Sequence, residues 1–152
     1  MTDDDVLGTI EIQVAMLMRL GEATRRSTEL KPHRALDRAA YVILRHLQAA
    51  GPQNVTALAD RLNLDGSTVT RQVTALERDG LAERRADPND GRGTVIEATA
   101  LGLKQVDAVA KARRSLYDRL LQDWSADDRR QLADVLRHFN ESAEAYMRAS
   151  RP

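Results

Sequence analysis

Apolar residues recur at spacings of three and four along most of the chain, which is the period of one face of an α-helix. The pattern predicts a helix over residues 5–28, a second over 34–50, a long one over 100–123 and a last one that begins after Ser125. The first helix is apolar on more than one side. Such a helix fits a core position, or a position where part of its surface faces another subunit.

Proline and glycine mark the ends of these helices. Residues 30–33 predict a break, because Pro32 disfavours a continuous helix. Gly51 and Pro52 form a strong terminator pair for the second helix. We therefore expect its inner face to consist of Leu36, Ala40, Ile43, Leu44 and Leu47.

Two short helices joined by a tight turn follow. Asn54 is a good N-cap for a helix over 55–62, and either Asp65 or Ser67 can cap a helix that runs to Asp79 and is closed by Gly80. The second helix has a buried face of Val69, Val73 and Leu76. Its outward face is polar and carries Ser67, Thr70, Arg71 and Thr74.

A β-hairpin is predicted next, with strands over 81–85 and 94–98. The second strand contains β-branched residues, and the loop over 86–93 is dense in turn formers, which indicates a long, mobile tip. Thr99 would cap the long helix over 100–123. The fold class is therefore mainly α, with a helix-turn-helix, a two-stranded β wing and long terminal helices.

A helix that enters the major groove of DNA needs a buried face that holds it to its domain and an exposed face of hydrogen-bonding side chains. The helix around Arg71 has both, and Arg71 is long enough for a bidentate contact to guanine. Arg92, at the hairpin tip, suits a narrow minor groove. Such faces also occur as plain solvated surfaces, and helix-turn-helix folds also dock proteins, so periodicity alone leaves both alternatives open.

Charge is balanced, since Lys plus Arg and Asp plus Glu both number 23. The window 19–46 is basic, with seven Lys and Arg against three acids, whereas 54–100 has six Arg against eight acids. Many DNA-binding domains carry a net positive charge. DNA contacts in the acidic window must therefore come from individually placed side chains.

Other function classes find little support. The chain has no cysteine, its three histidines are scattered, and no phosphate-binding loop or nucleophile elbow is present. We therefore expect no catalytic residues, no metal site and no cofactor. No stretch reaches the roughly 20 apolar residues of a membrane span, and the acidic start, with Asp3, Asp4 and Asp5, is unlike a signal peptide. A cytoplasmic protein is expected.

Several linked motifs, in order along the chain, resemble the MarR family of bacterial winged helix-turn-helix transcriptional regulators. The resemblance is specific over about 55–102, and the order of helices covers nearly the whole chain. Its motifs are Leu58-Ala59-Asp60-Arg61-Leu62, Ser67-Thr68-Val69-Thr70-Arg71, Leu76-Glu77-Arg78-Asp79-Gly80-Leu81, Arg84-Arg85, Asp87-Pro88-Asn89-Asp90-Gly91-Arg92 and Thr99-Ala100-Leu101-Gly102.

The resemblance implies a homodimer in which 1–33 and 100–152 form the dimerisation region and 34–99 the DNA-binding domain. Two recognition helices would occupy successive major grooves of a near-palindromic operator. The family's wing motif matches Asp90 and Arg92. Arg92 would enter the minor groove, and Asp90 would orient it or pair with another Arg. Gly91 and Gly93 depart from the family pattern and suggest a looser, less basic wing.

These arguments predict a sequence-specific DNA-binding regulator, and in particular a repressor that responds to a small anionic or aromatic effector. The alternative is a protein-interaction module with the same fold and no specific DNA binding. The basic window could hold an anionic effector or touch the DNA backbone. The predicted major-groove residues are Ser67, Thr68, Thr70, Arg71 and Thr74, the wing residues are Arg92 and Asp90, and the phosphate contacts are Asn54, Thr56 and Arg84.

Overall fold

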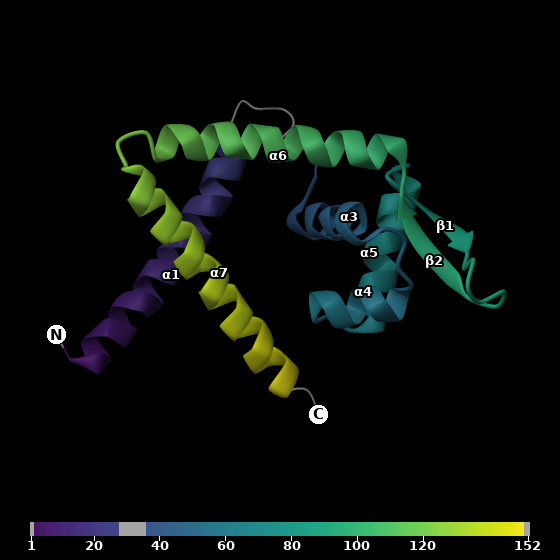
Figure 1. The fold of residues 1–152 in the computed structure, drawn as a ribbon, viewed down its shortest axis with the longest axis horizontal. Helices are drawn as coiled ribbons and strands as arrows, with labels where there is room; N and C mark the ends of the chain where they lie inside the picture. Colours follow the sequence, from purple (N-terminus) through teal and green to yellow (C-terminus); the bar gives the residue numbers. More distant parts are fainter. Residues whose placement is uncertain (1, 28–35, 151–152) are drawn as a thin grey trace.

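The computed structural model describes residues 2–27 and 36–150, and its helices and strands are labelled in Figure 1. It is mainly helical with one two-stranded antiparallel sheet. In chain order the elements are α1 Asp3–Ser27, α3 Arg38–Ala50, α4 Val55–Leu62, α5 Gly66–Arg78, β1 Ala82–Ala86, β2 Thr94–Ala98, α6 Ala100–Leu120 and α7 Ala126–Ala149.

A single apolar core holds α3, α4, α5, the hairpin and the first half of α6 together. The predicted inner faces of α3 and α5 are confirmed, since Ile43, Leu44, Val69 and Val73 are fully buried. In β2, Val95 and Ile96 are both buried, and Ile96 belongs to the same core. The helix-turn-helix is thus built on aliphatic packing, and the polar face of α5 is left outside. The remaining buried members include Leu36, Leu47, Leu58, Leu76, Leu81, Val106 and Val109.

The start of α6 is locked against the turn that follows α5. The Thr99 backbone N–H donates to the Leu81 carbonyl at 3.0 Å, and the Thr99 hydroxyl donates to the Gly80 carbonyl at 2.6 Å. The same hydroxyl caps α6 by accepting the Gly102 N–H at 3.0 Å. A Cβ on Gly102 would lie 2.0 Å from the Leu81 carbonyl oxygen, so only glycine permits this approach.

The hairpin has a third partner that the sequence pattern does not suggest. β1 and β2 pair with Ala82 opposite Ala98 and Arg84 opposite Ile96. On the other edge of β2, Gln53 exchanges two backbone hydrogen bonds with Ile96, at 3.0 and 2.7 Å. The residue that precedes the Asn54 cap is therefore tied to the sheet, which fixes the start of α4 against the wing.

The two terminal helices lie largely outside this core. Figure 1 shows α6 as a long bar with the wing at its N-terminal end and α7 turning back from the other end. None of the residues of α7 is buried within the chain, and Phe139 and Tyr146 are 46% and 75% exposed. Leu7 and Leu17 of α1 are exposed in the same way. No described helix combines the length and apolar character that a membrane crossing requires.

Some predicted boundaries are wrong. β1 begins at Ala82, one residue after the predicted start. The backbone N–H of Leu81 donates to the Leu76 carbonyl, and the Leu81 carbonyl accepts the Thr99 N–H. α6 ends at Leu120, short of the predicted residue 123, and Arg129 donates to the Leu121 carbonyl at 2.6 Å. α3 begins at Arg38 with Asp37 as its N-cap. The predicted break at 30–33 and the residues predicted to begin that helix lie outside the described residues.

Replacement of Gly102 by Ala should destabilise the fold by about 1–3 kcal/mol, because the added methyl group overlaps a backbone atom of a packed turn. Urea unfolding would measure the change. Gly66→Ala is the matched control, because its Cβ meets nothing within 4 Å and α5 gains helix propensity. Equal stability of the two variants would contradict the close approach of α6 to Leu81.

Candidate nucleic-acid interface

The beginning of α5 is organised by the carboxylate of Asp65, which is its N-cap. This carboxylate accepts hydrogen bonds from the Ser67 hydroxyl at 2.5 Å and from the hydroxyl and backbone N–H of Thr68, both at 2.7 Å. Together these bonds, the one from Ser67 foremost, hold the pKa of Asp65 well below its usual range. Of the two predicted major-groove residues here, Ser67 is exposed and Thr68 is half-buried.

The next turns of α5 present Thr70, Arg71 and Thr74 to solvent. The two threonine hydroxyls donate back into the helix, to the carbonyls of Gly66 and Thr70 at 2.8 and 2.9 Å. The Arg71 guanidinium has no hydrogen-bond or ion-pair partner within the described part of the chain. Arg71 is therefore the side chain of this face with its full set of donors available to a ligand.

The wing tip is closed by two aspartates. Asp87 accepts the Asn89 backbone N–H at 2.8 Å, and Asp90 accepts the Arg92 backbone N–H at 3.1 Å. Asp90 thus acts on the backbone of Arg92, and no ion pair between Asp90 and an arginine is found among the described residues. The Arg92 guanidinium itself is unpaired there.

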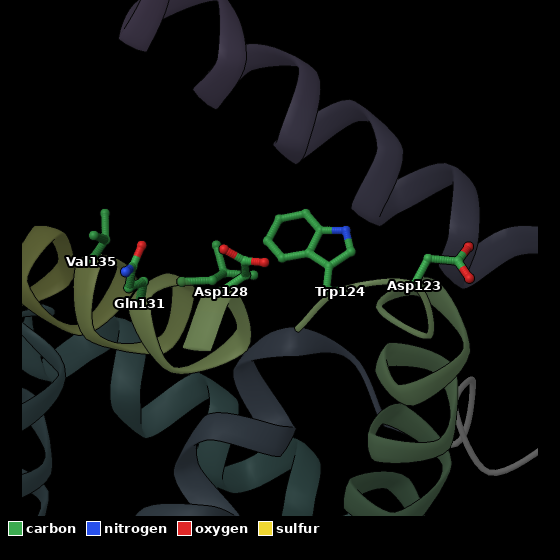
Figure 2. A pocket seen from close by; sticks show the side chains of 6 residues that line it. Asp123, Trp124, Asp128, Gln131 and Val135 are labelled. Atoms are coloured by element: carbon green, nitrogen blue, oxygen red, sulfur yellow. The ribbon is translucent and has the colours of Figure 1, made fainter. Parts of the chain in front are cut away.

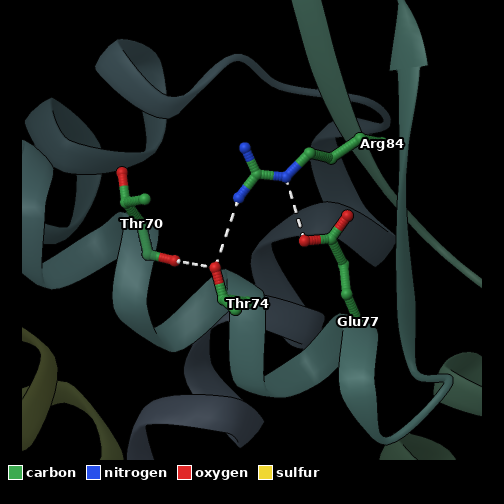
Figure 3. A network of polar contacts seen from close by, with 4 residues as sticks. All are labelled: Thr70, Thr74, Glu77 and Arg84. Atoms are coloured by element: carbon green, nitrogen blue, oxygen red, sulfur yellow. Dashed lines mark hydrogen bonds and ion pairs between the residues drawn. The ribbon is translucent and has the colours of Figure 1, made fainter.

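Arg84 lies on β1 but its side chain reaches α5, as Figure 3 shows. Its Nε donates to Glu77 Oε2 at 2.9 Å, and its Nη2 donates to Thr74 Oγ1 at 3.5 Å. The predicted phosphate-contacting arginine is therefore placed beside the exposed polar face of α5 rather than alone on the wing. Glu77 is not among the predicted site residues, although its spacing from Thr74 places both on one face of α5.

The start of α4 carries the remaining predicted phosphate contacts. Asn54 caps the helix by accepting the Ala57 N–H at 2.7 Å, and Thr56 is exposed. The N-terminus of a helix attracts anions through its free N–H groups and its dipole. Near the other end, Arg61 pairs with Glu144 of α7 at 3.4 Å, an exposed pair that contributes little stability by itself.

His46 of α3 is a titratable group outside the exposed face of α5 with a shifted pKa. Burial lowers the pKa of His46, and the positive charge of Arg61 lowers it further. His46 is therefore neutral near pH 7 and adds no positive charge toward a phosphate. Among the described residues, His, Asp and Glu side chains do not gather in groups of three or more that could hold a metal ion.

The helices α4 and α5 are joined by a tight turn and followed by a β-hairpin, from which Arg84 contacts α5. This arrangement defines a winged helix-turn-helix protein. Residues 36–94 match the MarR family. The HTH-type transcriptional regulator YxaD of Bacillus subtilis is 36% identical over 107 residues, which are 70% of this chain and 75% of the relative. The chain belongs to the MarR family of transcriptional regulators, whose members bind DNA.

Solved structures agree in fold. A MarR family protein from Bacillus stearothermophilus superposes with a TM-score of 0.76 at 20% identity, over 94% of this chain and 99% of that one. The PcaV transcriptional regulator of Streptomyces coelicolor, in complex with its natural ligand, gives a TM-score of 0.64 at 24% identity, over 84% and 91% of the two chains. These matches confirm the predicted winged-helix fold class.

The stability that Asp65 provides should depend on pH. Because its pKa is lower in the folded chain than in the unfolded one, the charged carboxylate stabilises the fold above about pH 4, and this is lost as pH falls through the folded value. Asp65→Asn should therefore unfold at lower urea than the wild type at pH 7, and the gap should narrow between pH 5 and pH 3. A gap that is constant over this range would contradict the hydrogen-bonded carboxylate.

Proposed function

We propose that this protein is a homodimeric repressor that reads a near-palindromic operator with two copies of α5. The observation that carries the proposal is the exposed face of α5, where Arg71 has no partner in the described chain, beside a wing that presents an unpaired Arg92. A dimer seated on a promoter represses by excluding polymerase from the DNA. In this proposal residues 34–99 bind DNA, and 1–33 with 100–152 form the dimerisation region.

Dimerisation is supported by the apolar surface of the terminal helices. Leu132, Val135, Phe139 and Tyr146 follow the period of one α7 face, yet α7 buries no residue within the chain. An exposed apolar stripe of this length usually marks a protein interface. A hollow of about 430 Å³ lies beside Trp124, at the corner between α6 and α7. Figure 2 shows side chains that line it, and a partner helix could fill it.

The DNA contacts divide by groove. Arg71, with Ser67, Thr70 and Thr74 around it, would face base edges in the major groove, where a bidentate arginine selects guanine. Arg92 would enter the minor groove, where its contact depends on groove width rather than on base identity. Thr56 and the N-terminus of α4 would hold the phosphate backbone. Thr68 is the weakest member of the predicted set, because it is half-buried, whereas Ser67, Thr70 and Thr74 are exposed.

An effector site is supported by a cleft of about 310 Å³ between the start of α3 and α5. Arg71 and Arg78 line it together with Gln72, whose buried Oε1 has no hydrogen-bond partner among the described residues. A small anionic or aromatic molecule in this cleft would compete for Arg71. It would release DNA only to the extent that it binds the DNA-free arrangement of the protein more tightly than the DNA-bound arrangement. Titration of benzoate, an anionic aromatic molecule, into the complex of protein and duplex would test whether a molecule of this kind releases DNA.

Selection of bound fragments from the host's genomic DNA at two salt concentrations tests the proposed function. We expect a near-palindrome with half-sites about one helical turn apart, and binding that weakens steeply as salt rises. Enrichment of no sequence at low salt would contradict the proposal and would favour a protein-docking role for the fold.

Removal of Arg71 and of Arg92 should have different effects on the selected duplex. Arg71→Ala should cost about 1–3 kcal/mol of binding free energy and relax the base preference at one position. Arg92→Ala should weaken binding with a smaller change in preference. Fluorescence anisotropy on the selected duplex and on single-base variants of it would measure both. Equal losses on every sequence for the two variants would rule out this division of roles.

A carboxylate on the apolar stripe of α7 should separate the protomers. Phe139→Glu should halve the mass measured by sedimentation at micromolar concentration and should abolish tight operator binding. Ala145→Glu adds the same group away from that stripe and should remain dimeric. If Phe139→Glu sediments as the wild type does, α7 is not a dimer contact.

A further inference from the structure

Two adjacent arginines of β1 point to opposite faces of the hairpin, as alternation along a strand requires. Arg85 pairs within the hairpin, with Glu83 at 3.3 Å and Glu97 at 2.6 Å. Arg84 instead crosses to α5 and pairs with Glu77 at 2.9 Å. The ion pair between Arg84 and Glu77 therefore joins the wing to α5. The pair between Arg85 and Glu97 stays within the hairpin and provides a comparison.

The hydroxyl proton of Thr74 and one acceptor position of its oxygen are used in this arrangement. Its hydroxyl proton is donated to the Thr70 carbonyl at 2.9 Å, and its oxygen accepts from Arg84 Nη2 at 3.5 Å. In Figure 3 the guanidinium lies over the helix between Thr74 and Glu77, and its other terminal nitrogen points away from both. Thr74 thus has no proton left for DNA, and the polar contact at this turn of α5 passes to Arg84.

The donors of Arg84 are only partly used. An arginine side chain carries five N–H groups. One on Nε goes to Glu77 and one on Nη2 goes to Thr74, which leaves three without a partner among the described residues. The side chains of Arg84 and Glu77 are 37% and 29% exposed, so solvent screens their attraction less than that of a fully exposed pair.

Glu77 places a negative charge on the helix that would approach DNA in the proposed function, and this charge by itself repels phosphates. We propose that Glu77 is a positioning residue for DNA recognition. It holds the Arg84 guanidinium over the exposed face of α5, so that the three remaining N–H groups belong to the recognition surface. The contact between Arg84 and DNA then forms only when α5 occupies the major groove of its own operator half-site. This inference rests on the proposed function.

Glu77→Gln tests the proposal, because it keeps the shape of the side chain and removes its charge. The probes are a fluorescent duplex of the sequence selected by the wild type and a shuffled duplex of the same length and composition. We expect Glu77→Gln to bind the selected duplex roughly tenfold more weakly, and to bind the shuffled duplex equally or more tightly. Glu97→Gln, which removes the carboxylate paired with Arg85, should preserve the ratio of the two affinities.

Arg84→Ala and the double variant complete a thermodynamic cycle. If Glu77 acts through Arg84, the double variant binds the selected duplex no more weakly than Arg84→Ala alone. Arg84→Lys, which keeps the charge but not the planar fork, should lose the same preference. Thermal unfolding of each variant separates lost binding from lost folding, and Arg84→Lys keeps the proposal testable if Glu77→Gln fails to fold.

The outcomes are distinct. Tighter binding of both duplexes by Glu77→Gln in equal measure, or losses that add in the double variant, would overturn the positioning role. If the wild type binds its selected duplex and Glu77→Gln behaves as Glu97→Gln does, only this inference fails. If the wild type selects no duplex, the proposed function fails and this inference falls with it.

Discussion

The contact between the start of α6 and the turn after α5 is the constraint on which the rest of the structure depends. Leu81 joins the recognition helix to the wing, and its carbonyl accepts the Thr99 N–H. Gly102 lets the first turn of α6 lie directly on that carbonyl. The orientation of α5 is therefore transmitted to α6, whose far end carries α7. We therefore expect a shift of α6 to reach the exposed face of α5 through this joint.

Acidic residues explain how a chain without net positive charge can present a DNA-binding surface. Asp65 caps α5, Asp90 closes the wing tip, and Glu77 and Glu97 each pair with an arginine of β1. Each carboxylate fixes a backbone or a cation in place. The affinity expected from such a surface comes from a small number of positioned donors, which favours sequence selectivity over broad attraction to phosphate.

Much of the fold was predictable because its signals are local. The caps Asn54, Asp65, Thr99 and Ser125 each accept a backbone N–H as their residue types suggest. The buried faces of α3 and α5 follow from helical spacing. The contacts between segments distant in sequence were not predictable. The Gln53 bridge to Ile96 and the Arg84 pair with Glu77 depend on the packing of the hairpin, which no periodicity encodes.

The same limit applies to the candidate site. Arg71 and Arg92 could be named from motif positions, and the structure leaves both unpaired among the described residues. That Thr68 and Thr74 have already donated their hydroxyl protons is visible only in three dimensions. The apolar pattern of the first helix fits either a core position or a subunit interface, and within one chain Leu7 and Leu17 of α1 are exposed, as is Phe139 of α7. In the proposed dimer a second protomer would cover these faces.

The distance between the two copies of α5 tests the central claim most directly. Because the chain contains no cysteine, Arg78→Cys gives a single nitroxide site per protomer at the exposed end of the helix. Pulsed electron resonance on the complex with a selected duplex should give one narrow distance distribution on the order of one DNA turn, about 34 Å. The absence of any distance between protomers, or a broad distribution that DNA leaves unchanged, would contradict the account.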